Sequence, residues 1–210
     1  MKKILLVLAA MAVTSVVNAQ VIWTNPITGT NPNTDNPYIT GQIFNLNTTV
    51  SGIGRGAGAV GTNANDRYNA NSWNTAALDT TAFFTFTLDA NTGFDIDFTS
   101  FVYTGQASPT GPTSFAFRSS MDSFAADLGT PTASGATISL SAAAFQNLTA
   151  PTEFRLYGFG ASAAGGTFSV NSFSFNGDVT VIPEPSTYAL LGLGLGALWF
   201  LRRKKHSAKA

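Results

Sequence analysis

The stretch Thr81–Tyr103, TAFFTFTLDANTGFDIDFTSFVY, decides the fold class of this chain. Apolar and polar residues alternate with a period of two over 84–88 and again over 94–98. This period places alternate side chains on opposite faces of a β-strand. Asn91, Thr92 and Gly93 have the composition of a turn, so we predict two strands joined as a hairpin. The alternation changes phase at Ser100, which predicts a bulge before Phe101.

The same alternation recurs on both sides of this stretch. We expect further strands at 38–46, 48–53, 113–118, 136–140 and 153–159, and one or two strands over 167–181. Residues 21–40 are predicted to be rich in turns, 52–61 to be a glycine-rich loop, and 141–148 to include a short helical turn. Short strands separated by about 8–12 residues of turn composition are typical of antiparallel sandwiches. We therefore predict an all-β ectodomain over residues 20–181, an antiparallel β-sandwich of the jelly-roll-like kind.

The composition of residues 20–182 excludes several classes of function. Their only cations are Arg55, Arg67, Arg118 and Arg155, and acidic residues outnumber them, so binding to nucleic-acid phosphates is not expected. The absence of cysteine excludes disulfides and thiolate metal sites. The single histidine, His206, lies outside this region, which excludes Ser-His-Asp catalysis and histidine-bound zinc within it. The domain must therefore be held by packing, and its phenylalanines, which include all but Phe200 of the 17 in the chain, supply the apolar area.

The first 19 residues have the three parts of a secretory signal peptide. Lys2 and Lys3 form a positive region, an apolar run follows, and small residues precede the predicted cut between Ala19 and Gln20. An uncleaved anchor is the alternative, but the apolar run is short for a membrane span. We predict export and cleavage by signal peptidase, so the mature chain begins at Gln20.

Residues 182–205, IPEPSTYALLGLGLGALWFLRRKK, combine a Pro-Glu-Pro triplet, an uncharged apolar segment and a basic cluster. We predict a transmembrane helix over 188–201. The cations that follow it place the end of the chain in the cytoplasm and the ectodomain outside. Judged by hydropathy alone, this segment could equally be a permanent anchor. The basic cluster consists of Arg202, Arg203, Lys204 and Lys205.

This order of parts resembles the PEP-CTERM sorting signal of exported bacterial proteins. Pro183, Glu184 and Pro185 match its triplet, and the four cations match its basic end. The resemblance implies that a membrane-embedded exosortase recognises the triplet, cleaves near it, and releases or transfers the cargo. Such proteins often occur in organisms that make exopolysaccharide. We assign residues 182–206 to this signal and 207–210 to a short remaining tail.

Candidate sites within the ectodomain are weak. Gly56–Gly61 matches a dinucleotide-binding glycine pattern but lacks the βαβ context that the pattern requires. Asp95 and Asp97, on the same face of a strand, could serve a glycan-cleaving site, and Asp66, Asp122 and Glu153 are other candidates, although carboxylates opposite a core face are usually solvated. The start of a calcium loop at Asp89 lacks its later ligands, and a hairpin turn explains it better. Arg118 and Arg155 are expected to form surface ion pairs with nearby acids.

Aromatic residues raise the alternative of a carbohydrate-binding platform. Trp73, Tyr103 and Tyr157 could stack on sugar rings, but we favour packing within the core for them. Segments 50–56, 115–124 and 154–177 also resemble a recurrent module of exported bacterial β-sandwich proteins, a resemblance that implies the fold and no activity.

We therefore predict a non-catalytic cell-surface or extracellular-matrix protein. Its expected partners are an exosortase-type enzyme, signal peptidase and the membrane, and no nucleic acid is expected. An exopolysaccharide-binding module is the alternative, and a glycan-cleaving enzyme ranks below both. No cofactor is expected, and structural calcium between the strands stays open.

Overall fold

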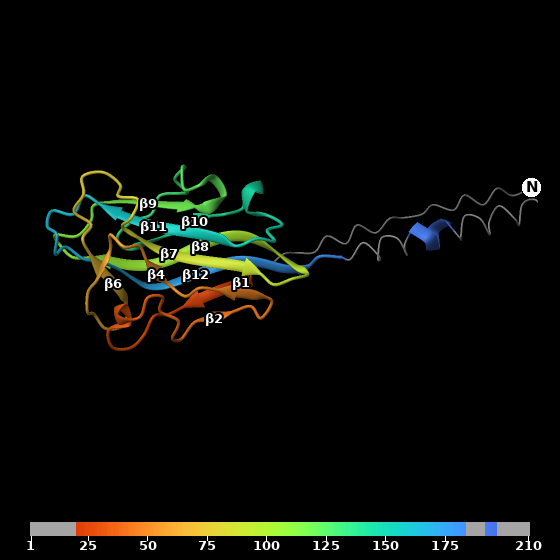
Figure 1. Ribbon diagram of the computed structural model, residues 1–210, viewed down its shortest axis with the longest axis horizontal. Helices are drawn as coiled ribbons and strands as arrows, with labels where there is room; N and C mark the ends of the chain where they lie inside the picture. The colour runs from red at the N-terminus through yellow and green to blue at the C-terminus, as the bar shows by residue number, and fades with distance from the viewer. Residues whose placement is uncertain (1–19, 184–191, 197–210) are drawn as a thin grey trace, which may run out of the picture.

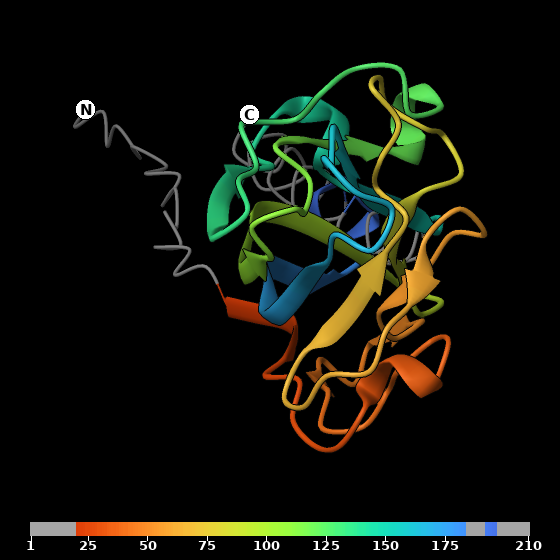
Figure 2. The same cartoon turned by 90° about the vertical axis from the view of Figure 1, so that its left-hand side faces the viewer.

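Two antiparallel β-sheets pack face to face in the computed structural model, which describes residues 20–183 and 192–196 (Figure 1). Every strand pairing is antiparallel. Figure 2 views the layers from the end of the domain that holds β6. The predicted all-β sandwich is confirmed.

The first sheet has the strand order β10-β8-β12-β1-β2, with β6 paired to β12 and β5 to β6. The second sheet has the order β3-β7-β11-β9, with β4 paired to β7. The strands are β1 (Gln20–Asn25), β2 (Ile43–Phe44), β3 (Thr48–Val50), β4 (Gly54–Arg55), β5 (Val60–Gly61), β6 (Tyr68–Asn71), β7 (Phe83–Ala90), β8 (Phe94–Ala107), β9 (Ser114–Ser119), β10 (Gly135–Ser139), β11 (Thr152–Phe159) and β12 (Phe168–Val181). The 3-10 turns are η1 (Pro32–Thr34), η2 (Ser120–Asp122) and η3 (Ala143–Phe145), the last lying where a helical turn was predicted.

The pairing of β8 with β12 runs the length of the domain. It extends from Phe94 opposite Val181 to Ala107 opposite Phe168. Gly177 faces Phe98 and Asn176 faces Ser100, so Thr99 is an extra residue in β8. This irregularity is the predicted bulge, and it lets Phe98 and Phe101 both point into the core, where each has no exposed surface.

The predicted hairpin between 81–88 and 94–98 is wrong in one respect. The turn at 91–93 exists, since the Phe94 N–H donates to the Asn91 carbonyl at 3.0 Å. However, β7 lies in one sheet and β8 in the other, so the turn crosses between the layers. Alternation shows that a segment is a strand, whereas the partner of each strand depends on contacts with distant segments.

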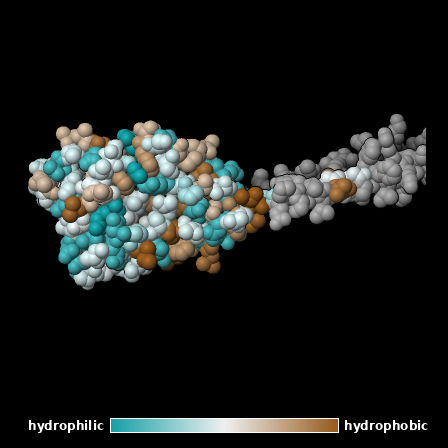
Figure 3. Space-filling view, in the orientation of Figure 1, coloured by the Kyte–Doolittle hydropathy of each residue, from teal (hydrophilic) through white to brown (hydrophobic). Residues whose placement is uncertain are grey.

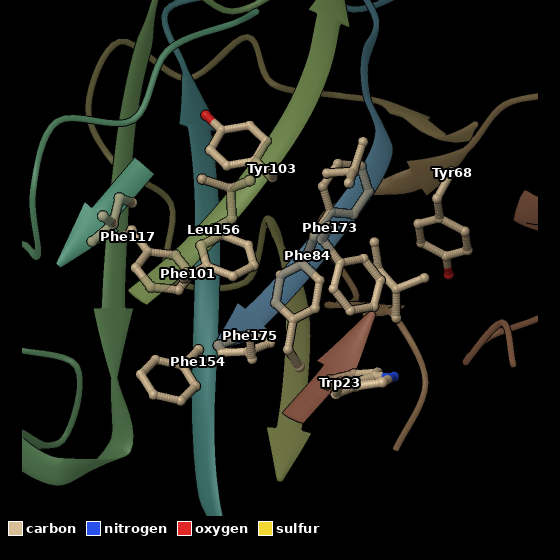
Figure 4. Packing of buried hydrophobic residues seen from close by; sticks show 14 of the residues in the cluster. Trp23, Tyr68, Phe84, Phe101, Tyr103, Phe117, Phe154, Leu156, Phe173 and Phe175 are labelled. Carbon is tan, nitrogen blue, oxygen red and sulfur yellow. The ribbon is translucent and has the colours of Figure 1, made fainter. Parts of the chain in front are cut away.

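Aromatic side chains from both sheets fill the space between them (Figure 4). Phe101 of β8 stacks on Phe117 of β9 with ring centroids 4.5 Å apart, and Phe117 stacks on Phe154 of β11 at 5.6 Å. Phe86 of β7 meets Phe173 of β12 edge to face at 4.9 Å. Each such pair adds about 0.5–1.5 kcal/mol beyond the burial of its area. The Phe101–Phe117 and Phe86–Phe173 contacts join the two layers without any disulfide, and Phe117–Phe154 extends the stack within the second sheet.

The early part of the chain departs most from the prediction. Residues 20–25, largely within the segment predicted to be turn-rich, form β1 between β12 and β2. The predicted strand at 38–46 is reduced to the two residues of β2 and an isolated bridge between Tyr38 and Ile53. The predicted glycine-rich loop at 52–61 contains β4 and β5.

Candidate functional site

The last strand of the sandwich leads directly into the predicted sorting segment. β12 ends at Val181, and the Ile182 N–H donates to the Gly93 carbonyl at 2.9 Å. Pro183 follows at once, and because proline has no N–H it cannot continue a ladder of this kind. The predicted triplet therefore begins one residue after the final strand-end hydrogen bond.

Most of the tail lies outside the described residues. This applies to Glu184 and Pro185, to the basic cluster at 202–205, and to most of the transmembrane helix predicted at 188–201. Residues 192–196 are described, and they are helical and exposed. Within the described ranges, 20–183 and 192–196, no helix has the length and apolar character needed to cross a membrane.

The predicted signal-peptidase site also falls at the edge of the described chain. Ala19 lies outside it, whereas Gln20 is the first residue of β1 and faces Gly177 of β12. The predicted mature N-terminus therefore coincides with the start of a strand. The predicted signal peptide precedes β1 and the predicted sorting segment follows β12, and these two strands are neighbours in the first sheet.

Hydrophobic side chains are exposed around the point where β12 ends. Leu46 is 88% exposed, the largest value among the large hydrophobic residues described, while Val181 is 66% and Ile182 39% exposed. Figure 3 shows hydrophobic residues gathered at this end of the domain. We call Leu46, the turn at 91–93, Val181 and Ile182 the tail-end surface.

Hydrogen bonds tie the parts of the tail-end surface together. The Asn91 side chain donates to the Leu46 carbonyl at 3.1 Å, and the Asn91 N–H donates to the Asn47 carbonyl at 2.9 Å. Asn45 accepts from the N–H of Asn47 at 2.9 Å through its side chain. The loop is therefore fixed through its backbone while the Leu46 side chain faces solvent. Sequence reasoning placed Leu46 at the end of a strand and missed this exposure.

The carboxylates that were considered for glycan cleavage have structural partners. Asp97 accepts the Asn147 N–H at 2.6 Å, Asp95 accepts the Thr180 hydroxyl, and Asp66 accepts the Gly29 N–H at 2.8 Å. Asp122 accepts the N–H groups of two residues in the loop that follows it. Glu153 pairs with Arg155 at 2.7 Å. Among the described residues, no cluster of three or more His, Cys, Asp or Glu has the geometry to hold a metal ion.

The three aromatic residues considered as a sugar-stacking platform are buried. Trp73 is 0%, Tyr103 2% and Tyr157 1% exposed. The Trp73 indole donates to the Ala70 carbonyl at 2.9 Å, and the Tyr103 hydroxyl bonds the backbone of Thr132. Burial raises the pKa of Tyr103, although the hydrogen bond to Thr132 opposes this. No ring of the three is available for stacking on a ligand in this structure. Trp73 and Tyr103 pack in the core, whereas Tyr157 is buried on the outer face of the second sheet, 5.5 Å from the ring of Phe83.

The glycine pattern at 56–61 has a packing explanation. Gly56 and Gly58 donate their N–H groups to the carbonyls of Phe83 and Thr81, both at 2.9 Å. A Cβ atom at Gly56 would collide with the Thr81 carbonyl and the Phe83 ring. Glycine is needed because two backbone segments approach closely, and no helix follows the pattern as a dinucleotide site requires.

Arg118 and Arg155 form ion pairs on the outer face of the second sheet, as expected. Arg118 Nε lies 2.6 Å from Asp127, and Arg155 Nε lies 2.7 Å from Glu153. The Arg155 guanidinium also lies 4.2 Å from the ring centre of Phe83 and 3.8 Å from that of Phe124. Sequence spacing gave no signal for this stacking, because Phe124 reaches it from a loop.

Comparison with known proteins assigns the tail. Residues 181–205 match the family model described as the PEP-CTERM protein-sorting motif. No curated protein and no solved structure matches the chain significantly. The match begins at the last residue of β12, so the motif and the sandwich adjoin without a linker. The chain is an exported protein that carries a PEP-CTERM sorting motif, the signal read by an exosortase.

Proposed function

We propose that this protein is a non-catalytic β-sandwich cargo that an exosortase-type enzyme sorts to the cell surface or the extracellular matrix. The observation that carries the proposal is the sorting motif at 181–205, which starts where the last strand of the sandwich ends. The hydrogen-bonded roles of Asp66, Asp95, Asp97, Asp122 and Glu153 support a role without catalysis. No cofactor enters the proposal.

The order of events follows from the parts of the chain. Signal peptidase removes residues 1–19 after export, and the segment 188–201 holds the chain in the membrane with its basic end in the cytoplasm. The sandwich, whose jelly-roll-like topology remains part of the proposal, then lies outside. Cleavage near Pro183–Thr187 separates the sandwich from the segment in the membrane.

The test is mass spectrometry of the mature protein from membrane and extracellular fractions of the native cells. We expect the extracellular form to begin at Gln20 and to end between Pro183 and Thr187. A chain that retains Ala210 and is found only in membranes would instead identify a permanently anchored surface protein. Deletion of Pro183–Pro185 is the matched variant and should leave the full-length chain in the membrane fraction.

A further inference from the structure

We propose that the tail-end surface rests on the lipid surface of the membrane that holds the uncleaved tail. This inference depends on the proposed function, since it needs the segment 188–201 to be in the membrane. It adds an interaction surface to the sandwich itself, with lipid as the partner.

Chain length places the surface close to the membrane. Val181 is the last residue paired in the sheet, and residues 182–187 separate it from the predicted membrane segment that begins at Tyr188. An extended chain of this length spans at most about 25 Å. The Ile182 N–H is bonded to the Gly93 carbonyl. The distance between the sheet and the membrane therefore cannot increase by release of the end of β12 unless that hydrogen bond breaks. The part of the sandwich nearest the bilayer is therefore the tail-end surface.

The chemistry of the surface suits the apolar boundary of a bilayer. Leu46 projects from a loop whose backbone is fixed by Asn45 and Asn91, so little additional ordering is needed when it enters an apolar layer. Val181 and Ile182 are exposed beside the same turn. Apolar side chains at a membrane surface enter about 5–10 Å into the boundary between headgroups and acyl chains.

Charge does not explain the contact. Asp95, Asp97 and Asp178 lie on β8 and β12 near this end, with Asp97 directly opposite Asp178. None of the described arginines lies on either strand. Anionic lipids would be repelled by these carboxylates, so the contact depends on apolar burial and zwitterionic lipid is the proper probe.

The test uses single-cysteine labelling, which the absence of native cysteine makes unambiguous. The full chain is taken from cells that lack the processing enzyme and is placed in phosphatidylcholine vesicles containing nitroxide-labelled lipid. A fluorophore at Thr92→Cys reports on the tail-end surface, and one at Ala57→Cys reports on the opposite end. The two probes are on the order of 30 Å apart, judged from the length of β7, which begins beside residue 57 and ends at the turn that holds residue 92.

We expect the lipid nitroxide to quench the probe at residue 92 and to leave the probe at residue 57 unaffected. Leu46→Ser should reduce quenching at residue 92. Val60→Ser, which changes a 53% exposed apolar residue on β5, should not reduce it. Equal quenching at both probes, or no loss with Leu46→Ser, would overturn the proposal.

Two further outcomes would assign the surface to another partner and so overturn the proposal. Quenching that appears only when the processing enzyme is added would assign the contact to that enzyme. Quenching that is lost when the protein is diluted in the bilayer would assign it to a second copy of the chain. Flotation of the full chain with the vesicles separates the two proposals. A chain that fails to float contradicts insertion of the tail, whereas a floating chain with an unquenched probe contradicts only the lipid contact.

Discussion

The two ends of the sandwich differ in the residues that cover the core there. At the end opposite the tail, the Arg55 guanidinium donates to the Tyr68 hydroxyl at 2.9 Å and to the Asn33 carbonyl at 2.8 Å. The Tyr68 hydroxyl also bonds Asn36 at 3.1 Å, and Tyr68 is fully buried. At the tail end, Leu46 and Val181 lie exposed beside a tight turn.

The difference shows which end has most of its polar groups bonded within the domain and which end exposes apolar side chains to water. The Tyr68 end bonds most of its polar groups within the domain and covers the core, although the Asn33 Oδ1 atom is buried without a partner. The tail end leaves apolar groups uncovered at the point where β12 ends and the sorting motif begins. We call the end closed by the hydrogen bonds of Tyr68 and Arg55 the sealed end. The tail end, which exposes Leu46 and Val181, is instead suited to contact with a second apolar surface.

The largest effect is expected at the core that both ends share. Phe175→Ala removes a fully buried ring that stacks on Trp23 with centroids 5.7 Å apart. The free energy of unfolding should fall by about 3–5 kcal/mol, as for other large aromatic deletions. Denaturant unfolding measures this. A loss below about 1 kcal/mol would contradict a single shared core.

Alkaline pH should act next, mainly at the sealed end. Burial raises the pKa of Tyr68 to about 12, with Arg55 opposing the shift and Asp35 adding to it. Because the neutral phenol is favoured in the folded state, its stabilisation is complete below pH 10 and is lost as the pH rises toward 12.

At pH 11 this loss should be on the order of 1 kcal/mol for Tyr68, and Tyr103, whose pKa is also raised by burial, should add a loss of its own. Urea unfolding between pH 9 and pH 11 measures it. The free energy of unfolding should fall less steeply with pH in Tyr68→Phe than in the parent chain. An unchanged slope would show that Tyr68 does not contribute to the loss of stability.

A smaller effect is expected from the Tyr68→Phe substitution at neutral pH. It deletes the hydroxyl shared by Arg55, Asn36 and Asp35 but keeps the ring in the core. We expect a loss of about 0.5–1.5 kcal/mol in the free energy of unfolding, because the hydrogen bonds of the hydroxyl are lost while its exposed or half-buried partners can bond to water. Thermal unfolding checks this, and a stabilised variant would show that the sealed end does not depend on its polar network.

The smallest effect on stability is expected at the tail end. Leu46→Ser should change the free energy of unfolding by no more than about 0.5 kcal/mol, because the side chain makes little contact with the core. The same measurement on Val60→Ser provides the matched control. A loss of several kcal/mol for Leu46→Ser would show that Leu46 supports the fold, and the contrast between the two ends would then fail.

Much of the fold could be predicted where alternation is strong and local. The strands at 83–90, 135–139 and 152–159 and the bulge near residue 100 follow from side-chain period alone. β1 was missed although Val21–Thr24 consists of residue types enriched in strands, because the segment is short and the Asn-Pro pairs that follow it indicate turns. It becomes a strand by pairing with β12, about 150 positions further along the chain.

The candidate site likewise has one part that could be predicted from the sequence and one part that could not. Pro183, Glu184 and Pro185 could be found from sequence because an enzyme reads the order of residues in such a motif. Leu46 could not, since a single leucine between two asparagines gives no periodic signal. Its exposure depends on Asn91, a residue of the turn between β7 and β8, whose side chain donates a hydrogen bond to the Leu46 carbonyl and so fixes the loop.

The sequence by itself determined the β character of the sandwich and the presence of the sorting motif, because both are encoded over short stretches. Only the tertiary structure decided which strands pair, which aromatic rings are buried and which end of the domain adjoins the motif. These properties depend on the packing of segments far apart in the chain, and a local pattern cannot specify such distant partners. The closeness of Leu46 to the end of β12 is the clearest instance, because it exists only through the turn at 91–93.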